Sequence, residues 1–171
     1  MRLRNLGPEF DEFVASASDS LLRTAYLLCG DRHLAEDLLQ TALLRTARRW
    51  STARENPTPY ALRVIVNLSK DDRRNRGRRV VETPLTGVAG PVVPAPADDV
   101  LARQVLLAAV KRLPARQRAV LVLRFFADLS VEQTAEVLEC SVGTVKSQTH
   151  HALTKLREQL SQALEDTYAD R

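Results

Sequence analysis

The spacing of apolar residues along the chain predicts α-helices separated by short polar or proline-containing breaks. Residues 8–28 carry apolar side chains three and four positions apart, and Gly30 ends this first helix. Asp31 is suited to cap a second helix over residues 32–50, whose buried stripe consists of leucines and alanines. No stretch shows the alternation that is typical of a β-strand. The sequence therefore predicts an all-α protein.

Prolines interrupt the pattern after the second helix. Pro57 and Pro59 restrict the residues before them, so residues 51–58 are expected to form a loop. A third helix is predicted from about Pro59 to Arg74, with Pro59 in the first helical position. Its end is strongly basic. Cations at a helix C-terminus are favourable in themselves, but this density favours contact with nucleic acid. The cations are Lys70, Arg73, Arg74, Arg76, Arg78 and Arg79.

The periodicity disappears between residues 80 and 97, which contain four prolines and two glycines. Such a composition is typical of a semi-extended linker. We therefore expect two small helical domains, residues 1–79 and residues 98–171, joined by a flexible linker at 80–97. Each domain is small enough that its own core would be thin.

The second half is expected to begin with a helix capped by Asp98 and Asp99 and stopped at Pro114, followed by a helix over residues 115–127. Residues 129–160 then read as a helix-turn-helix. Ser130 and Gln133 fit a capping box, and Ser141 can cap the next helix. The motif also needs a small residue where its helices cross and an apolar residue early in the second helix. Ala135 and Val145 meet these requirements, whereas Glu139 occupies the turn position that glycine usually takes.

The outer face of the second helix of this motif is polar. A helix placed in the major groove would present such side chains to base edges and phosphates. The same spacing also fits an ordinary helical hairpin with a solvated face. The residues that project from the first turns are Gly143, Thr144, Lys146, Ser147, His150 and His151.

The charge balance is basic, with a net charge of +4 and a pI of about 9.4 over 171 residues. A basic protein of this kind is expected to bind an anionic partner, but the charge does not distinguish nucleic acid from a membrane surface. No apolar run suits a membrane span or a signal peptide, so a cytoplasmic location is expected. Cys29 and Cys140 lie far apart in sequence and read as reduced packing residues. No metal site and no cofactor are predicted.

Two short motifs, in this order along the chain, indicate a family. AEDLLQ (residues 35–40) lies in the second helix, and LSVEQTAEVL (residues 129–138) precedes VGTVKS (residues 142–147) in the helix-turn-helix. With the basic third helix and the proline-rich linker between them, they resemble bacterial sigma factors of the extracytoplasmic-function group of the sigma-70 family, and look closest to the actinobacterial SigE-type branch. The resemblance implies an alternative sigma factor that binds core RNA polymerase and directs promoter-specific initiation at −10 and −35 elements.

The resemblance also implies roles for individual residues. Asp37 and Gln40 would contact polymerase, although by themselves they read as a solvated face. Trp50 could stack on a base, but its place at the end of an apolar helix favours the core. Residues for the unpaired −10 strand would be Arg63, Asn67, Lys70, Arg73 and Arg74. Residues for the −35 element would be Thr144, Lys146, Ser147, Gln148, His150 and His151.

Gln148 and His151 depart from the commoner family pattern, which has arginine at both positions. Glutamine lacks the charge, and a neutral histidine lacks the two-pronged contact of a guanidinium. The resemblance further implies an anti-sigma factor as a partner, and no small-molecule substrate or insertion into a membrane. A stand-alone DNA-binding regulator remains the alternative. His33, His150 and His151 form no catalytic or metal-binding pattern, so an enzyme is not expected.

Overall fold

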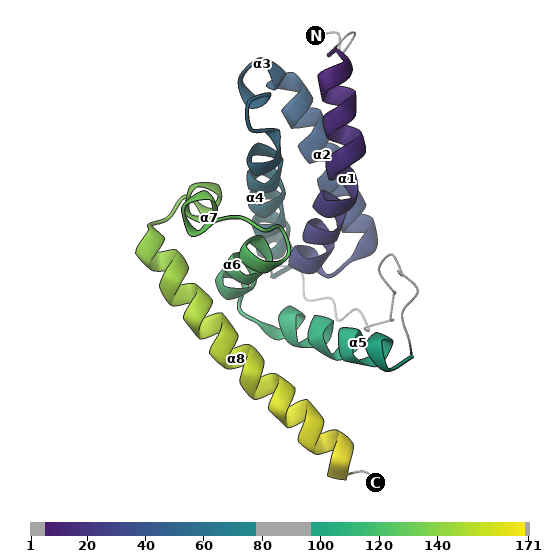
Figure 1. Cartoon of the computed structure of the whole chain (residues 1–171), viewed down its shortest axis with the longest axis vertical. Helices are drawn as coiled ribbons and strands as arrows, with labels where there is room; N and C mark the ends of the chain where they lie inside the picture. Colours follow the sequence, from purple (N-terminus) through teal and green to yellow (C-terminus); the bar gives the residue numbers. More distant parts are fainter. Residues whose placement is uncertain (1–5, 78–96, 170–171) are drawn as a thin grey trace.

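A computed structural model of the chain describes residues 6–77 and 97–169, with side chains described for 6–71 and 102–165 except 103 and 164. Within these ranges the chain forms eight helices and no strand, as the sequence predicts (Figure 1). The expected linker, residues 80–97, lies outside the described residues except for its last residue. Ala97 already belongs to a helix, so Asp98 and Asp99 lie inside the first turn of that helix and do not cap it.

Helices α1 (Pro8–Cys29), α2 (Arg32–Arg48) and α4 (Pro57–Gly77) pack on one another in the first half of the chain. Gly30 ends α1 in a left-handed conformation, and the Asp31 carboxylate accepts a hydrogen bond from the Leu34 backbone N–H at 2.8 Å. Both predicted helix boundaries are therefore confirmed.

The expected loop at residues 51–58 is partly wrong. A short helix, α3 (Trp50–Ala53), occupies its beginning, and α4 starts at Pro57 rather than at Pro59. Both prolines lie in the first turn of α4, where the backbone N–H groups have no helical acceptor, so the missing N–H of proline costs no hydrogen bond. Two prolines two residues apart are thus compatible with a helix start as well as with a loop.

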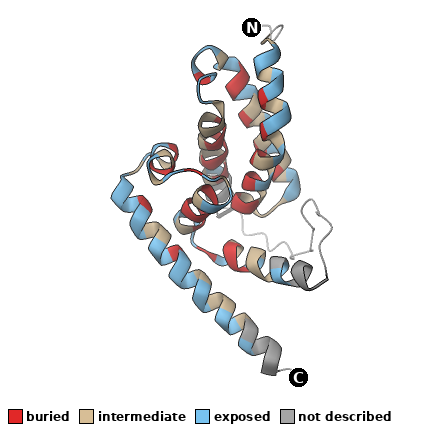
Figure 2. Ribbon diagram, viewed as in Figure 1, coloured by how far each residue is buried: buried red, intermediate tan, exposed pale blue. Residues whose placement is uncertain are grey.

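The second half comprises α5 (Ala97–Arg112), α6 (Ala115–Phe125), α7 (Val131–Leu138) and α8 (Val142–Ala169). In Figure 1, α8 runs diagonally past the end of α6 and extends beyond the rest of the molecule. The side of α8 that faces away from α5 and α6 is largely exposed (Figure 2). The inner side of this helix packs against α5 and α6 and contributes the fully buried Val145 and Ala152.

The two halves share buried residues. Helix α1 packs against α5 and α6, and α4 packs against α7. One apolar cluster contains Leu21 and Ile65 of the first half together with Val110, Leu113 and Val122 of the second. All five are at most 2% exposed. The sequence predicts a separate, thin core in each half. In the structure, the described residues of both halves instead pack into one common core.

The helix-turn-helix forms as predicted. Ser130 and Gln133 complete a capping box at the start of α7, and Ala135 packs with Val145 and Val120 in a small cluster of its own. The turn is closed by a hydrogen bond from the Cys140 N–H to the Ala135 carbonyl at 3.0 Å. Glu139 adopts the left-handed conformation with φ of 55°, which confirms that a non-glycine residue occupies a glycine-type position.

This strain predicts that Glu139→Gly stabilises the protein. The left-handed region costs a residue with a Cβ about 1 kcal/mol, and Glu139 is exposed, so its side chain contributes little packing. Urea unfolding should show a gain in the free energy of unfolding of up to about 1 kcal/mol. Asp128→Gly is a matched control because Asp128 also has a positive φ, 53°, but aspartate tolerates this region better and should gain less. A loss of stability in Glu139→Gly would contradict the strain argument.

Candidate polymerase and nucleic-acid interfaces

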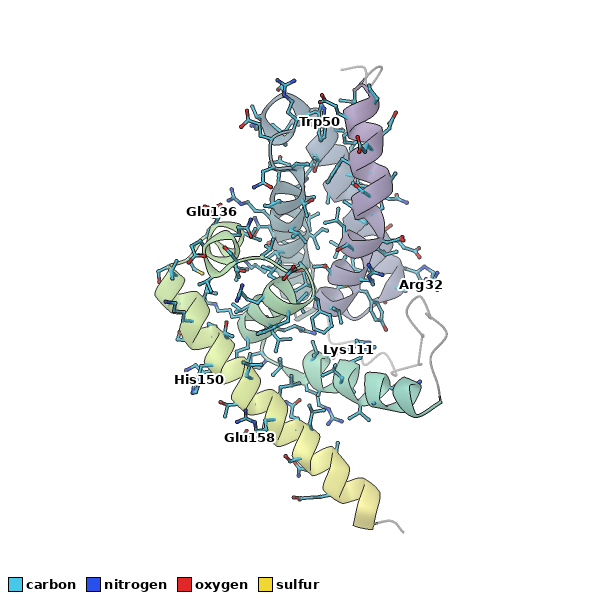
Figure 3. The ribbon with its side chains drawn as sticks, viewed as in Figure 1. Arg32, Trp50, Lys111, Glu136, His150 and Glu158 are labelled. Atoms are coloured by element: carbon cyan, nitrogen blue, oxygen red, sulfur yellow. The ribbon has the colours of Figure 1, made fainter. Side chains whose placement is uncertain are left out.

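The first turns of α8 carry the residues predicted to read the −35 element. Val145 is fully buried, and this fixes the rotation of the helix so that the opposite side faces outward. Thr144, Lys146, Ser147, His150 and His151 are exposed, and Gln148 is half-buried. Figure 3 shows His150 pointing away from the bundle. The structure therefore brings all six predicted residues to the start of one helix.

Hydrogen bonds within α8 hold the short side chains of this surface in place. Ser141 accepts from the Thr144 N–H at 3.1 Å and lies 2.8 Å from the Thr144 hydroxyl, which confirms its capping role. The Ser147 hydroxyl donates to the Thr144 carbonyl at 3.0 Å. The His150 and His151 rings lie 5.8 Å apart. A preordered surface of this kind loses less side-chain entropy when it binds.

A carboxylate lies close to this surface. The pKa of Glu132 is lowered by a hydrogen bond from its own backbone N–H, then by the Ser130 hydroxyl, and further by the positive charges of Lys146 and Arg124. Glu132 is therefore ionised near neutral pH, and the ammonium group of Lys146 has an anionic neighbour on α7. DNA phosphates would compete with that neighbour for Lys146.

The residues predicted for the −10 element follow one face of α4. Arg63, Asn67, Lys70 and Arg74 are four, three and four positions apart, which aligns them along a helix. The structure places Arg73 on the same helix, and the side chains of Arg73 and Arg74 lie outside the described residues. Arg63, Asn67 and Lys70 are half-buried. The structure thus confirms that these positions share a helix, and the −10 role stays a prediction.

The N-terminal part of α1 and the second half of α2 enclose a groove of about 810 Å³. Gln40 lines it, whereas Asp37 is exposed one turn earlier on the same helix and lies outside the lining. Leu44 is 37% exposed and contributes apolar surface. This groove was not predicted from the sequence, because helical spacing assigns Leu43 to the buried stripe of α2 without showing that α1 leaves part of that stripe open. The lining is Leu6, Gly7, Pro8, Phe10, Asp11, Val14, Gln40, Leu43, Leu44 and Ala47.

Trp50 belongs to an aromatic cluster with Phe10 and Phe13. Its ring meets that of Phe10 edge-on with centroids 5.0 Å apart, and it lies 5.9 Å from the Phe13 ring. The favoured interpretation of Trp50 as a packing residue is confirmed.

Neither cysteine takes part in a disulfide, and the Cys29 thiol donates to the Asp31 carbonyl.

Within the residues that the structure describes, no three histidine, cysteine or acidic side chains are grouped as metal ligands. Over the same part of the chain, no helix combines the length and the apolar character that crossing a bilayer requires.

Comparison with known families matches both halves of the chain. Residues 13–79 match Sigma-70 region 2, and residues 103–156 match Sigma-70 region 4. The RNA polymerase sigma-E factor of Streptomyces coelicolor is 39% identical over 154 residues, covering 89% of this chain and 86% of that relative. The chain belongs to the sigma-70 family of RNA polymerase sigma factors. It is an alternative sigma factor of the extracytoplasmic-function group, and such factors direct promoter-specific transcription initiation without being enzymes themselves.

Two further comparisons, one with a curated relative and one with a solved structure, agree with this family assignment. The ECF RNA polymerase sigma factor SigE of Mycolicibacterium smegmatis is 32% identical over 172 residues, covering 94% of this chain and 65% of that relative. The crystal structure of the sigma factor RpoE with the anti-sigma factor NepR from Bartonella quintana gives a TM-score of 0.75 at 23% identity, covering 91% of this chain and 98% of that one. This second likeness shows the fold. The matches to regions 2 and 4 leave residues 80–102 between them.

Proposed function

We propose that this sigma factor divides promoter recognition among three surfaces. The groove between α1 and α2 would dock on core RNA polymerase, the basic face of α4 would hold the unpaired strand of the −10 element, and the start of α8 would read the −35 element. The observation that carries the proposal is the exposed row of polar side chains at the start of α8, which is the second helix of a capped helix-turn-helix. The other half of the same chain contains the basic helix α4. In this reading, residues 1–79 and 98–171 act as two domains and 80–97 as their linker.

The groove offers polymerase both apolar area and a polar anchor. Leu44 is partly exposed at its wall, and Gln40 adds an amide that can donate and accept hydrogen bonds. Protein interfaces place apolar contacts at the centre and polar groups at the rim. Asp37, exposed one turn before Gln40, is placed to serve as such a rim residue.

The basic face of α4 suits a single strand whose phosphates follow the helix. Single-strand binding combines cations along the backbone with surfaces for unpaired bases. Arg63 and Lys70 supply cations seven positions apart, with the amide of Asn67 between them. The cations Arg73 and Arg74 would extend the same track toward the end of the helix.

Recognition of the −35 element would depend on a surface with fewer fixed charges than arginine-bearing relatives have. His151→Arg is therefore expected to change the preferred −35 sequence, since arginine can donate two hydrogen bonds to guanine and a neutral histidine cannot. A gain of about tenfold at guanine-containing sites would correspond to one good bidentate contact. Binding of holoenzyme to a library of −35 sequences measures the change. Lys155→Arg, an exposed position beyond the predicted contacts on the same helix, is the control. An unchanged profile for His151→Arg would reject this role.

We also propose that an anti-sigma factor holds the chain inactive. The similar RpoE structure was solved in complex with an anti-sigma factor, and CnrH, with a TM-score of 0.63 at 21% identity, in complex with the cytosolic domain of CnrY. The chain would act in the cytoplasm, without a cofactor and without catalytic activity of its own. The chemistry of RNA synthesis would belong to the polymerase.

Run-off transcription tests the proposed function. Purified core polymerase with this protein, on a pool of genomic upstream fragments, should give transcripts that share one pair of −10 and −35 sequences. Core polymerase alone is the control for background initiation. DNA binding without core polymerase and without specific initiation would favour a stand-alone helix-turn-helix regulator instead.

A further inference from the structure

Two adjacent histidines lie on the surface proposed to read the −35 element. His150 and His151 are both exposed, and their ring centroids are 5.8 Å apart with the ring planes inclined by 64°. Figure 3 shows His150 directed away from the bundle. Within the described part of the chain, neither ring makes a hydrogen bond or an ion pair. Both imidazoles are therefore available to a proton and to a ligand.

Histidine changes its charge in a pH range in which the other groups of this surface keep theirs. A histidine side chain ordinarily has a pKa of about 6.5, whereas a lysine side chain titrates near about 10. The pKa of Glu132, the carboxylate near Lys146, is lowered first by a hydrogen bond from its own backbone N–H and then by the Ser130 hydroxyl. Glu132 therefore stays ionised when the histidines begin to take up protons.

The charged neighbours of the two histidines on α8 itself are cations. Lys146 lies four positions before His150, and Lys155 lies four positions after His151, so each is one helical turn away. A proton on either ring adds to a surface that is already positive. The phosphates of bound DNA are the groups that would compensate this added charge.

Helices α5, α6 and α7 pack against α8, and their charged groups have other surroundings. Three glutamates of α7 and the turn border a hollow of about 600 Å³ whose lining ends at Val142, about two turns before the histidines. Arg124 of α6 donates to the Leu129 carbonyl, and Lys111 of α5 donates to the Tyr26 hydroxyl. The charged or titratable side chains described on these helices and their connections are Lys111, Arg112, Arg116, Arg118, Arg124, Asp128, Glu132, Glu136, Glu139 and Cys140.

We propose that His150 and His151 act as proton-dependent cations, so that binding to the −35 element strengthens as the pH falls. The proposal rests on the −35 role proposed above for the start of α8. A protonated imidazole donates from both nitrogens and carries a charge that a phosphate can pair with, whereas a neutral imidazole carries none. The complex therefore takes up protons, and its extra affinity is present at and below the ordinary pKa of histidine and is lost above it.

Histidine at position 151 makes conditional a charge that arginine would make permanent. Arginine, which the commoner family pattern has at this position, stays protonated at any pH at which the protein is folded. The two imidazolium groups can be charged together, because charges 5.8 Å apart in water repel each other only weakly. The strength of −35 recognition would then follow the proton concentration around the holoenzyme.

Holoenzyme bound to a promoter mapped by run-off tests the proposal. The Kd of a fluorescent promoter duplex is measured near pH 6 and near pH 8 for wild type and for the double variant His150→Gln/His151→Gln. Dividing the Kd of the variant by that of wild type at each pH removes the pH dependence of polymerase itself. We expect this ratio to rise about tenfold from pH 8 to pH 6. His33→Gln, at an exposed histidine on α2, is the control and should follow wild type.

The salt dependence separates a cation from a neutral contact to a base. Near pH 6, the slope of log K against log salt should be steeper for wild type than for the double variant by about one for each paired histidine. Near pH 8 the two slopes should agree. His151→Lys, which has a fixed charge, should retain only the part of the pH response that depends on His150. Circular dichroism checks that each variant is folded. A ratio that does not change with pH, or slopes that agree at both pH values, would overturn the proposal.

Two further measurements locate the effect and separate it from the proposed function. On a duplex that lacks the −35 region, wild type and the double variant should bind equally at both pH values, and a persistent difference would reject the −35 surface as the site. Failure of wild type to initiate specifically in run-off would reject the proposed function and the proton dependence together. Specific initiation with a pH-independent ratio would reject the proton dependence alone.

Discussion

Leu44→Asp is expected to abolish binding to core RNA polymerase and, with it, specific transcription. Leu44 is 37% exposed and lies beside Gln40 in the groove between α1 and α2. A carboxylate buried at the apolar centre of an interface, without a partner, costs several kcal/mol. A loss of about 2–4 kcal/mol corresponds to roughly 30- to 1000-fold in Kd. Fluorescence anisotropy of labelled sigma factor titrated with core polymerase measures this change.

Two controls separate docking from folding in this experiment. Leu44→Met keeps the size and apolar character of the side chain, and its affinity should stay within about threefold of wild type. In the absence of polymerase, the Leu44→Asp protein should still unfold cooperatively on heating, because the side chain at position 44 already reaches solvent at the groove wall. A Leu44→Asp protein that is folded and still binds core polymerase with wild-type affinity would remove the groove from the proposed docking surface. Gln40 and Asp37 would then have to act elsewhere or not at all.

Local chemistry made the helix boundaries predictable. Asp31, Ser130 and Ser141 accept hydrogen bonds from backbone N–H groups at the starts of their helices, as residues of these types do in most proteins. The left-handed Glu139 was predictable for the same reason, since the turn fixes its backbone whatever the side chain. The start of α4 was not, because Pro57 fits the first turn of a helix as well as the loop before it.

The exposed polar surface proposed to read the −35 element was predictable because a single helix carries all of it. Once Val145 is assigned to the buried side, the helical period places Ser147, His150 and His151 on the opposite side, with Thr144 and Lys146 at its edges. The groove between α1 and α2 was not predictable, since its walls come from two helices and depend on how deeply α1 covers Leu44. The contact of Arg63 with α7 joins residues 73 positions apart, and no local pattern encodes such a pair.

Arg63 illustrates why a residue type does not define a role. Its spacing from Asn67 and Lys70 indicates a phosphate track, whereas its hydrogen bond to the Glu136 carbonyl is that of a helix cap. Only the Nη2 group donates in this structure, so the other N–H groups of the guanidinium are not committed to the cap.

Val145→Asp should unfold the helix-turn-helix and eliminate −35-dependent transcription. Val145 is fully buried with Val120 and Ala135 in a cluster too small to rearrange around a charge. A buried, unpaired carboxylate costs about 4–5 kcal/mol, which is a large part of the total stability of a small domain. Circular dichroism should show partial loss of helix, and a −35 duplex should no longer bind. Val142→Asp is the matched control, because Val142 is 36% exposed and a carboxylate at the start of α8 interacts favourably with the helix dipole.

The extent of unfolding in Val145→Asp also tests the proposed domains. If residues 1–79 fold independently, amide hydrogen exchange should remain slow in α1, α2 and α4 while α7 and α8 lose protection. Because the two halves share a core, some protection should be lost at Leu21 and Ile65, which pack with residues of the second half. Complete loss of protection in both halves would mean that the first half is not stable without the second. In that case the core shared by the two halves would be a requirement for folding of the first half.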